Sequence, residues 1–123
     1  CGVAPQAACA ALRKQIHWMH IKDACVGTGQ VVPAGQGDGH LREVISVLSA
    51  TVDREMTLTL EPHLAVFQGL THLERAGNET KIPAFTYQDN REAFDAAANA
   101  LRQLLGEMGY QEINEGGKRI WTK

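Results

Sequence analysis

The sequence predicts an α/β fold, because helical and strand-like segments alternate along one short chain. In chain order we expect a helix, a strand, a helix, a strand and a helix, the alternation typical of proteins with parallel strands. The chain has 123 residues, of which 44% are hydrophobic and 21% charged, a composition in the range of one globular domain. Two strands alone are too few to bury both faces of a parallel sheet.

The first helix and the first strand lie close to the N-terminus. Pro5 opens a helical run that reaches Leu12, since proline is tolerated in the first turn of a helix. Residues 16–23 then alternate between two faces with the period of a strand. One face carries Ile16, Trp18, His20 and Lys22, and the other carries His17, Met19, Ile21 and Asp23.

A glycine-rich segment separates this strand from the second helix. Five glycines and Pro33 between positions 27 and 39 predict a long loop without regular structure. The run of residues 34–39 invites comparison with a phosphate-binding loop, but it lacks the GxxxxGK[ST] pattern, which favours a lid or a turn with positive φ angles. A helical stripe follows, with Asp38 placed to cap it and an end expected near Ala50; its apolar members are Leu41, Val44, Ile45 and Leu48.

Residues 56–61 alternate again and predict the second strand, with Glu61 at its C-terminal end and Pro62 terminating it. Leu58 and Leu60 form its aliphatic face, opposite Thr57, Thr59 and Glu61. A second irregular segment is expected from about residue 63 to residue 88.

The last helix has the strongest signal in the chain. Asp89 and Glu92 form a capping-box pattern, an apolar stripe runs from Phe94 to Met108, and Gly109 is placed to end the helix in a left-handed cap. The polar tail that follows is compatible with a short strand or with an arm that docks elsewhere.

Composition and charge exclude several classes of function. The net charge is -2 and the basic residues are scattered, so nothing predicts binding to nucleic acid or to an acidic membrane. No apolar run approaches the roughly 20 residues of a membrane span, and no signal peptide precedes the first helix, so we expect a soluble, cytoplasmic protein. The odd number of cysteines without a CxxC pair favours reduced thiols. Because the chain opens with Cys1, we also expect that upstream sequence has been removed.

The polar residues of both predicted strands gather at their C-terminal ends, the edge where α/β proteins build sites. If the strands are adjacent and parallel, His20 and Glu61 are neighbours there. An imidazole nitrogen and a carboxylate oxygen can ligate Mn²⁺, Mg²⁺, Co²⁺ or Zn²⁺. The simpler alternatives are a structural histidine, a solvated turn at Glu61, and a surface ion pair between Lys22 and Asp23.

Three motifs in this order carry a resemblance to a known family: HWMHIKDA at residues 17–24, VVPAGQGDGHLREVISVL at 31–48 and LTLEPHL at 58–64, followed by an amphipathic helix. The combination resembles the C-terminal part of the xylose isomerase-like superfamily of TIM barrels. The resemblance implies that residues 1–123 are a C-terminal fragment of a (β/α)8 barrel, with about two strands and three helices, incomplete as a single chain. Its core would be residues 5–109 and its tail residues 110–123.

The resemblance also implies roles for individual residues. His20 would be a divalent-metal ligand, and Glu61 would be both a metal ligand and one of two acid/base carboxylates. Lys22, Asp23 and His63 lie at the same mouth of the barrel, formed by the C-terminal ends of the strands, and would contact substrate. The remaining metal ligands belong to earlier strands, so the ligand set on this chain is incomplete.

The function implied is that of a sugar or sugar-phosphate isomerase or epimerase, which moves a proton next to a carbonyl, with this chain inactive alone. Alternatives are a dehydratase or an apurinic endonuclease of the superfamily, and a non-catalytic sugar-binding or assembly module on the same fold. Because open parallel strands pair readily with other chains, we expect a homo-oligomer.

Overall fold

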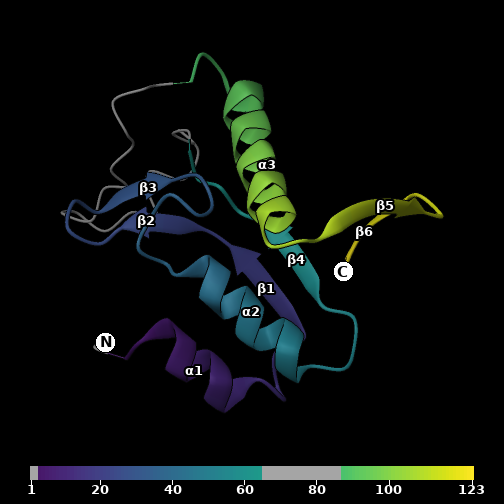
Figure 1. Cartoon of the computed structure of the whole chain (residues 1–123). Helices are drawn as coiled ribbons and strands as arrows, with labels where there is room; N and C mark the ends of the chain where they lie inside the picture. The colour runs from purple at the N-terminus through teal and green to yellow at the C-terminus, as the bar shows by residue number, and fades with distance from the viewer. Residues whose placement is uncertain (1–2, 65–86) are drawn as a thin grey trace.

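The computed structural model describes residues 3–64 and 87–123, in which three helices accompany three two-stranded sheets (Figure 1). The helices are α1 (Pro5–Leu12), α2 (Leu41–Thr51) and α3 (Asn90–Glu107). The strands are β1 (Trp18–Ile21), β2 (Asp23–Cys25), β3 (Gln30–Val32), β4 (Thr57–Leu60), β5 (Gln111–Glu115) and β6 (Lys118–Thr122). The expected mixed α/β architecture is confirmed, and no sheet closes within the described residues. Most of the irregular segment expected at residues 63–88 lies outside them.

The sheet of β1 and β4 joins two strands that are far apart in the sequence. The strands run parallel, in a register that pairs Trp18 with Thr57 and Ile21 with Leu60. One further hydrogen bond extends the ladder, as the Glu61 N–H donates to the carbonyl of Ile21 at 3.0 Å. Parallel neighbours require a long crossover connection, which β2, β3 and α2 provide here. The expected parallel orientation is therefore confirmed, and the two strands are adjacent.

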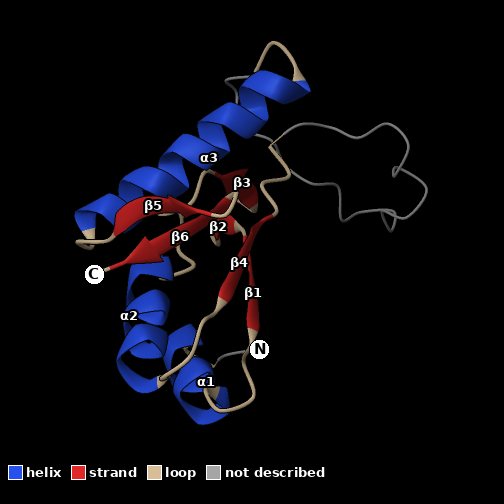
Figure 2. Cartoon of the chain, turned by 90° about the vertical axis from the view of Figure 1, so that its right-hand side faces the viewer, coloured by secondary structure: helices blue, strands red, loops and turns tan. Residues whose placement is uncertain are grey.

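One face of this sheet packs on the helices. Ile21 is completely buried and belongs to a core cluster that Met19, Leu58 and Leu60 join from the same face. Its other buried members are Ala34, Leu41, Ile45, Leu104 and Leu105. In Figure 2, α1, α2 and most of α3 lie to one side of β1 and β4. On the opposite face, Trp18 is 62% exposed. The aliphatic faces predicted from the alternation are thus the buried ones.

The first strand is shorter than expected, and the glycine-rich loop is more regular. β1 ends at Ile21, and Asp23 already begins an antiparallel hairpin in which β2 pairs with β3. The turn of this hairpin contains Gly29 at φ +67°. The expectation of one strand over 16–23 followed by an irregular loop is wrong here, because Val31 and Val32 form a strand too short to show any alternation.

Two sets of hydrogen bonds hold the first helix and the segment that follows it. The buried Cys9 thiol donates to the carbonyl of Val44 on α2 at 3.9 Å, and burial raises the pKa of this thiol. The guanidinium of Arg54 donates to the carbonyls of three residues between α1 and β1: Arg13, Lys14 and Ile16. Since Arg54 lies just before β4, this contact brings the starts of β1 and β4 together.

The start of α2 differs from the prediction. Its N-cap is His40, at φ +51°, and no side chain caps it. The Asp38 carboxylate instead accepts the N–H of Val26 at 2.8 Å, within the β2–β3 region. The assignment of Asp38 as the cap is therefore wrong, because its carboxylate accepts the N–H of Val26 instead of an N–H of α2.

The sequence signals predicted for the two ends of α3 are both confirmed. The Asp89 side chain accepts the N–H of Glu92 at 2.8 Å. Gly109 adopts φ +85°, and the Tyr110 N–H donates to the carbonyl of Leu105 at 3.0 Å, as in a Schellman motif. The stripe is less regular than predicted, since Phe94 is 53% exposed.

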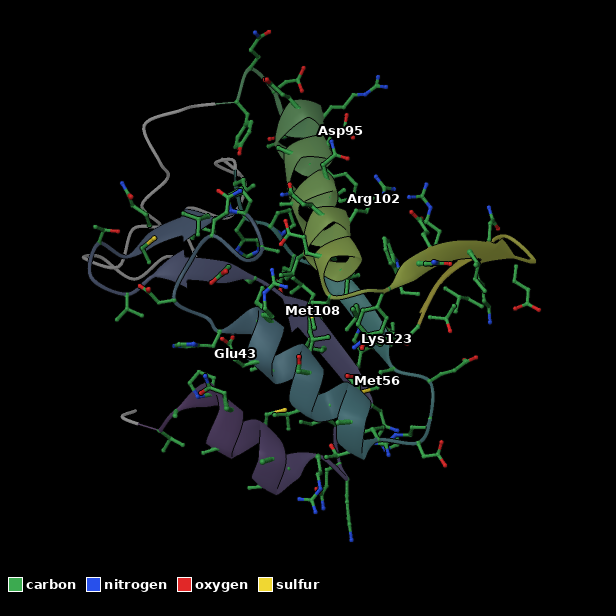
Figure 3. All side chains as sticks on the ribbon, in the orientation of Figure 1. Glu43, Met56, Asp95, Arg102, Met108 and Lys123 are labelled. Atoms are coloured by element: carbon green, nitrogen blue, oxygen red, sulfur yellow. The ribbon has the colours of Figure 1, made fainter. Side chains whose placement is uncertain are left out.

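The tail forms a hairpin, with Gly116 and Gly117 at φ +58° and +81° in the turn between β5 and β6. Arg102 on α3 contacts Glu112 on β5, with 3.5 Å between the guanidinium Nε and the carboxylate. Figure 3 shows Arg102 on the side of α3 nearest the hairpin and Lys123 near the end of the helix. The Lys123 ammonium lies 4.7 Å from the centre of the Tyr110 ring. No helix in the described ranges has the length and apolar character to cross a membrane.

Replacing Ile21 with valine should lower the free energy of unfolding by about 0.5–1.5 kcal/mol, the usual cost of one methylene in a packed core. Denaturant unfolding followed by circular dichroism measures the change. The matched control is Ile113→Val, because Ile113 is 43% exposed and its methylene is not fully buried. Equal losses in both variants would contradict the assigned core.

Candidate functional site

Four side chains form a continuous row of contacts at the C-terminal ends of β1 and β4. Nδ1 of His20 lies 3.0 Å from Oε2 of Glu61, and the other carboxylate oxygen, Oε1, lies 3.3 Å from Nε2 of His63. Nδ1 of His63 is in turn 2.9 Å from the ammonium of Lys22. The row is therefore His20, Glu61, His63 and Lys22, and its members come from two segments of the chain.

The parallel register explains why these residues meet. His20 pairs with Thr59, so Glu61 follows one pair beyond the end of β4, on the same face as His20. Pro62 then ends the strand, and His63 adopts φ +45°, in the left-handed region that residues other than glycine seldom occupy. The condition under which the sequence makes His20 and Glu61 neighbours, adjacent parallel strands, is met, and the two side chains lie 3.0 Å apart.

The row is accessible to solvent. The side chains of His20, Glu61 and His63 are 61%, 44% and 41% exposed. The hydrogen bond from His20 is the main cause that lowers the pKa of the Glu61 carboxyl, and the nearby His63 and Lys22 act in the same direction. Partial desolvation opposes this shift. The lowered pKa keeps Glu61 ionised at neutral pH, as a carboxylate that can bind a cation.

Asp23 lies next in the chain to Lys22 but has a different environment. It is 3% exposed, and its carboxylate accepts four backbone N–H groups at 2.9–3.0 Å. The donors are Ala24, Gly35, Gly37 and Gly39. A Cβ added at Gly37 or Gly39 would lie 2.5 or 2.7 Å from Oδ1 of Asp23. The carboxylate thus requires glycine at these positions.

This arrangement decides two alternatives left open by the sequence. The loop amides that resemble a phosphate site point at the carboxylate of the chain's own Asp23, as in an anion-binding nest with an internal anion. Lys22 contacts His63 rather than Asp23, so the surface ion pair between Lys22 and Asp23 is not formed. Of the five residues predicted for the site, four meet at the mouth and Asp23 holds the adjacent loop.

Two further residues, Trp18 and Thr59, lie on this face and were not predicted from the sequence as site residues. The indole N–H of Trp18 donates to Oγ1 of Thr59 at 2.5 Å, and the Trp18 ring centre lies 6.4 Å from that of His20. Their signal was present in the alternation, since Trp18 precedes His20 by two positions and Thr59 precedes Glu61 by two.

The donor chemistry of the row fits part of a metal site. His20 offers an imidazole nitrogen and Glu61 a carboxylate oxygen, both accepted by divalent transition metals. Across residues 3–64 and 87–123, no three His, Cys, Asp or Glu side chains are grouped so that they could hold a metal ion. Any metal held here would need ligands beyond this pair.

No protein-family model, no curated protein and no solved structure matches this chain.

Replacing His20 with alanine should raise the pKa of the Glu61 carboxyl toward its ordinary value, because the main hydrogen bond that lowers it is lost. Carboxyl-carbon NMR during a pH titration measures this. In the native chain the stabilising contribution of ionised Glu61 is complete above its unfolded-state pKa and is lost as pH falls through the lower folded-state pKa. The variant should lose the part of that contribution that comes from His20, while His63 and Lys22 keep the rest.

Glu107 is the internal control for this titration, since hydrogen bonds from Gln103 and Arg42 lower its pKa independently of His20. An unchanged Glu61 titration, or an equal shift of Glu107, would contradict the assignment.

Proposed function

We propose that the chain is the C-terminal portion of a (β/α)8 barrel of the xylose isomerase-like superfamily, and that this barrel is a divalent-metal-dependent sugar or sugar-phosphate isomerase or epimerase. The observation that carries the proposal is the 3.0 Å contact between His20 and Glu61 at the C-terminal ends of two parallel, adjacent strands. Barrel enzymes place their reactive groups at this end of the strands.

The order and packing of the elements support the barrel part of the proposal. β1 leads through the β2–β3 hairpin to α2, and β4 leads toward α3, which repeats the strand-then-helix unit of such barrels. The helices cover the aliphatic face of the sheet, whereas His20 and Trp18 occupy the opposite face. In a closed barrel, that polar face would line the interior.

In this proposal His20 and Glu61 would hold the cation, which when bound polarises a substrate oxygen next to the reacting carbon. Glu61 would accept the proton from that carbon, since its carboxyl group is ionised at neutral pH and can act as a general base. A second carboxylate and the remaining ligands would come from strands beyond these two, so the chain is inactive alone. Lys22 and His63 would contact the hydroxyls or the phosphate of the substrate at the mouth.

Native mass spectrometry of the chain with and without Mn²⁺ tests the proposal. We expect an oligomer, because the outer edges of β1 and β4 can pair with another copy, and we expect that it gains Mn²⁺. His20→Ala and Glu61→Ala should each abolish the gain.

His17→Ala is the matched control, since His17 is an exposed histidine directly before β1 and lies outside the row. A chain that gains no Mn²⁺, or whose gain is equally lost in His17→Ala, would contradict the assignment of His20 and Glu61 as metal ligands of this chain. It would favour the non-catalytic module instead.

A further inference from the structure

We propose that His20 and His63 carry their protons on opposite ring nitrogens, which leaves a free lone pair on Nε2 of His20. Lys22 and His63 then act as positioning residues for Glu61. The inference rests on the proposed function only in naming Nε2 as the atom that meets a cation. The proton positions follow from which groups can donate and which can accept.

The first step concerns His20. The ionised Glu61 carboxylate can only accept hydrogen bonds, so Nδ1 of His20, 3.0 Å away, is the donor. A neutral imidazole carries a single N–H, and Nε2 therefore holds a lone pair. The side chain of His20 is 61% exposed, so the imidazole as a whole is accessible to solvent.

The second step concerns His63 and gives the opposite result. The Lys22 ammonium can only donate, so Nδ1 of His63, 2.9 Å away, is the acceptor. The proton of His63 is then on Nε2, which lies 3.3 Å from Oε1 of Glu61. Each oxygen of Glu61 thus receives one N–H, from histidines in opposite tautomers.

The backbone independently supports a positioning role at this end of the row. His63 keeps a left-handed φ of +45°, a conformation that persists when surrounding contacts fix it. Lys22 lies between Ile21, which is fully buried, and Asp23, whose carboxylate binds four backbone N–H groups. The backbone of both residues is therefore held, and the Lys22–His63 contact links the two strand ends.

Long-range ¹H–¹⁵N NMR of the imidazoles in the metal-free 123-residue chain, at a mildly alkaline pH, reads the tautomers directly. We expect His20 protonated at Nδ1 and His63 at Nε2. His17 is the control and should show the tautomer mixture of a free side chain. The same tautomer for His20 and His63, or a mixture in either, would overturn the proposal.

Two Lys22 variants separate positioning from simple folding. Lys22→Met should convert His63 to a tautomer mixture while His20 keeps its proton on Nδ1, and Lys22→Arg should restore His63 because a guanidinium also only donates. Lys14→Met, at an exposed lysine outside the row, should change neither histidine. A His63 tautomer that is unchanged in Lys22→Met, or not restored by arginine, would refute the role of Lys22.

The two proposals fail separately. The tautomers are read without metal, so opposite tautomers in a chain that gains no Mn²⁺ would leave this inference standing and overturn the assignment of His20 and Glu61 as metal ligands of this chain. Mn²⁺ binding with identical tautomers would do the reverse.

Discussion

The parallel pairing of β1 and β4 is the interaction on which the rest of the structure depends. It brings together His20 and Glu61, which are 41 positions apart in the sequence. The same pairing directs Met19, Ile21, Leu58 and Leu60 into the core, and a shift of one residue would turn this aliphatic set to the solvent. Burial of the aliphatic face therefore fixes the register, and the register in turn positions the site.

Asp23 is the second constraint, because it is the buried ionisable residue nearest to the site. A buried carboxylate is costly unless its oxygens are satisfied, and here four N–H groups satisfy them. The alternating glycines at 35, 37 and 39 follow from this requirement, since Gly37 and Gly39 have no room for a Cβ beside Oδ1. The loop thus folds around Asp23, and Lys22 is held at the mouth as a result.

Sequence reasoning recovered the features that depend on periodicity and on local capping. The faces of β1 and β4, the stripe of α2, the Asp89 cap and the Gly109 terminus each follow from a few neighbouring residues, and the structure has them all. The same alternation predicts the His20–Glu61 contact, provided that the two strands are adjacent and parallel.

What the sequence left out depends on contacts between distant segments or on unusual backbone angles. The strands β2 and β3 have three residues each, too few for a periodic signal. The tail hairpin had a usable signal in Gly116 and Gly117 between two polar runs, but few apolar residues to reveal its strands. The Lys22–His63 contact depends on the left-handed backbone of His63, which no rule for histidine predicts.

The parallel pairing of β1 with β4 is tested most directly by nuclear Overhauser effects between the two strands in the isotope-labelled chain. Parallel pairing predicts contacts in ascending order, from Trp18 with Thr57 to Ile21 with Leu60. An antiparallel set, with Trp18 near Leu60 and Ile21 near Thr57, or no contact between the strands, would contradict it. Either result would separate His20 from Glu61 and remove the basis of the site.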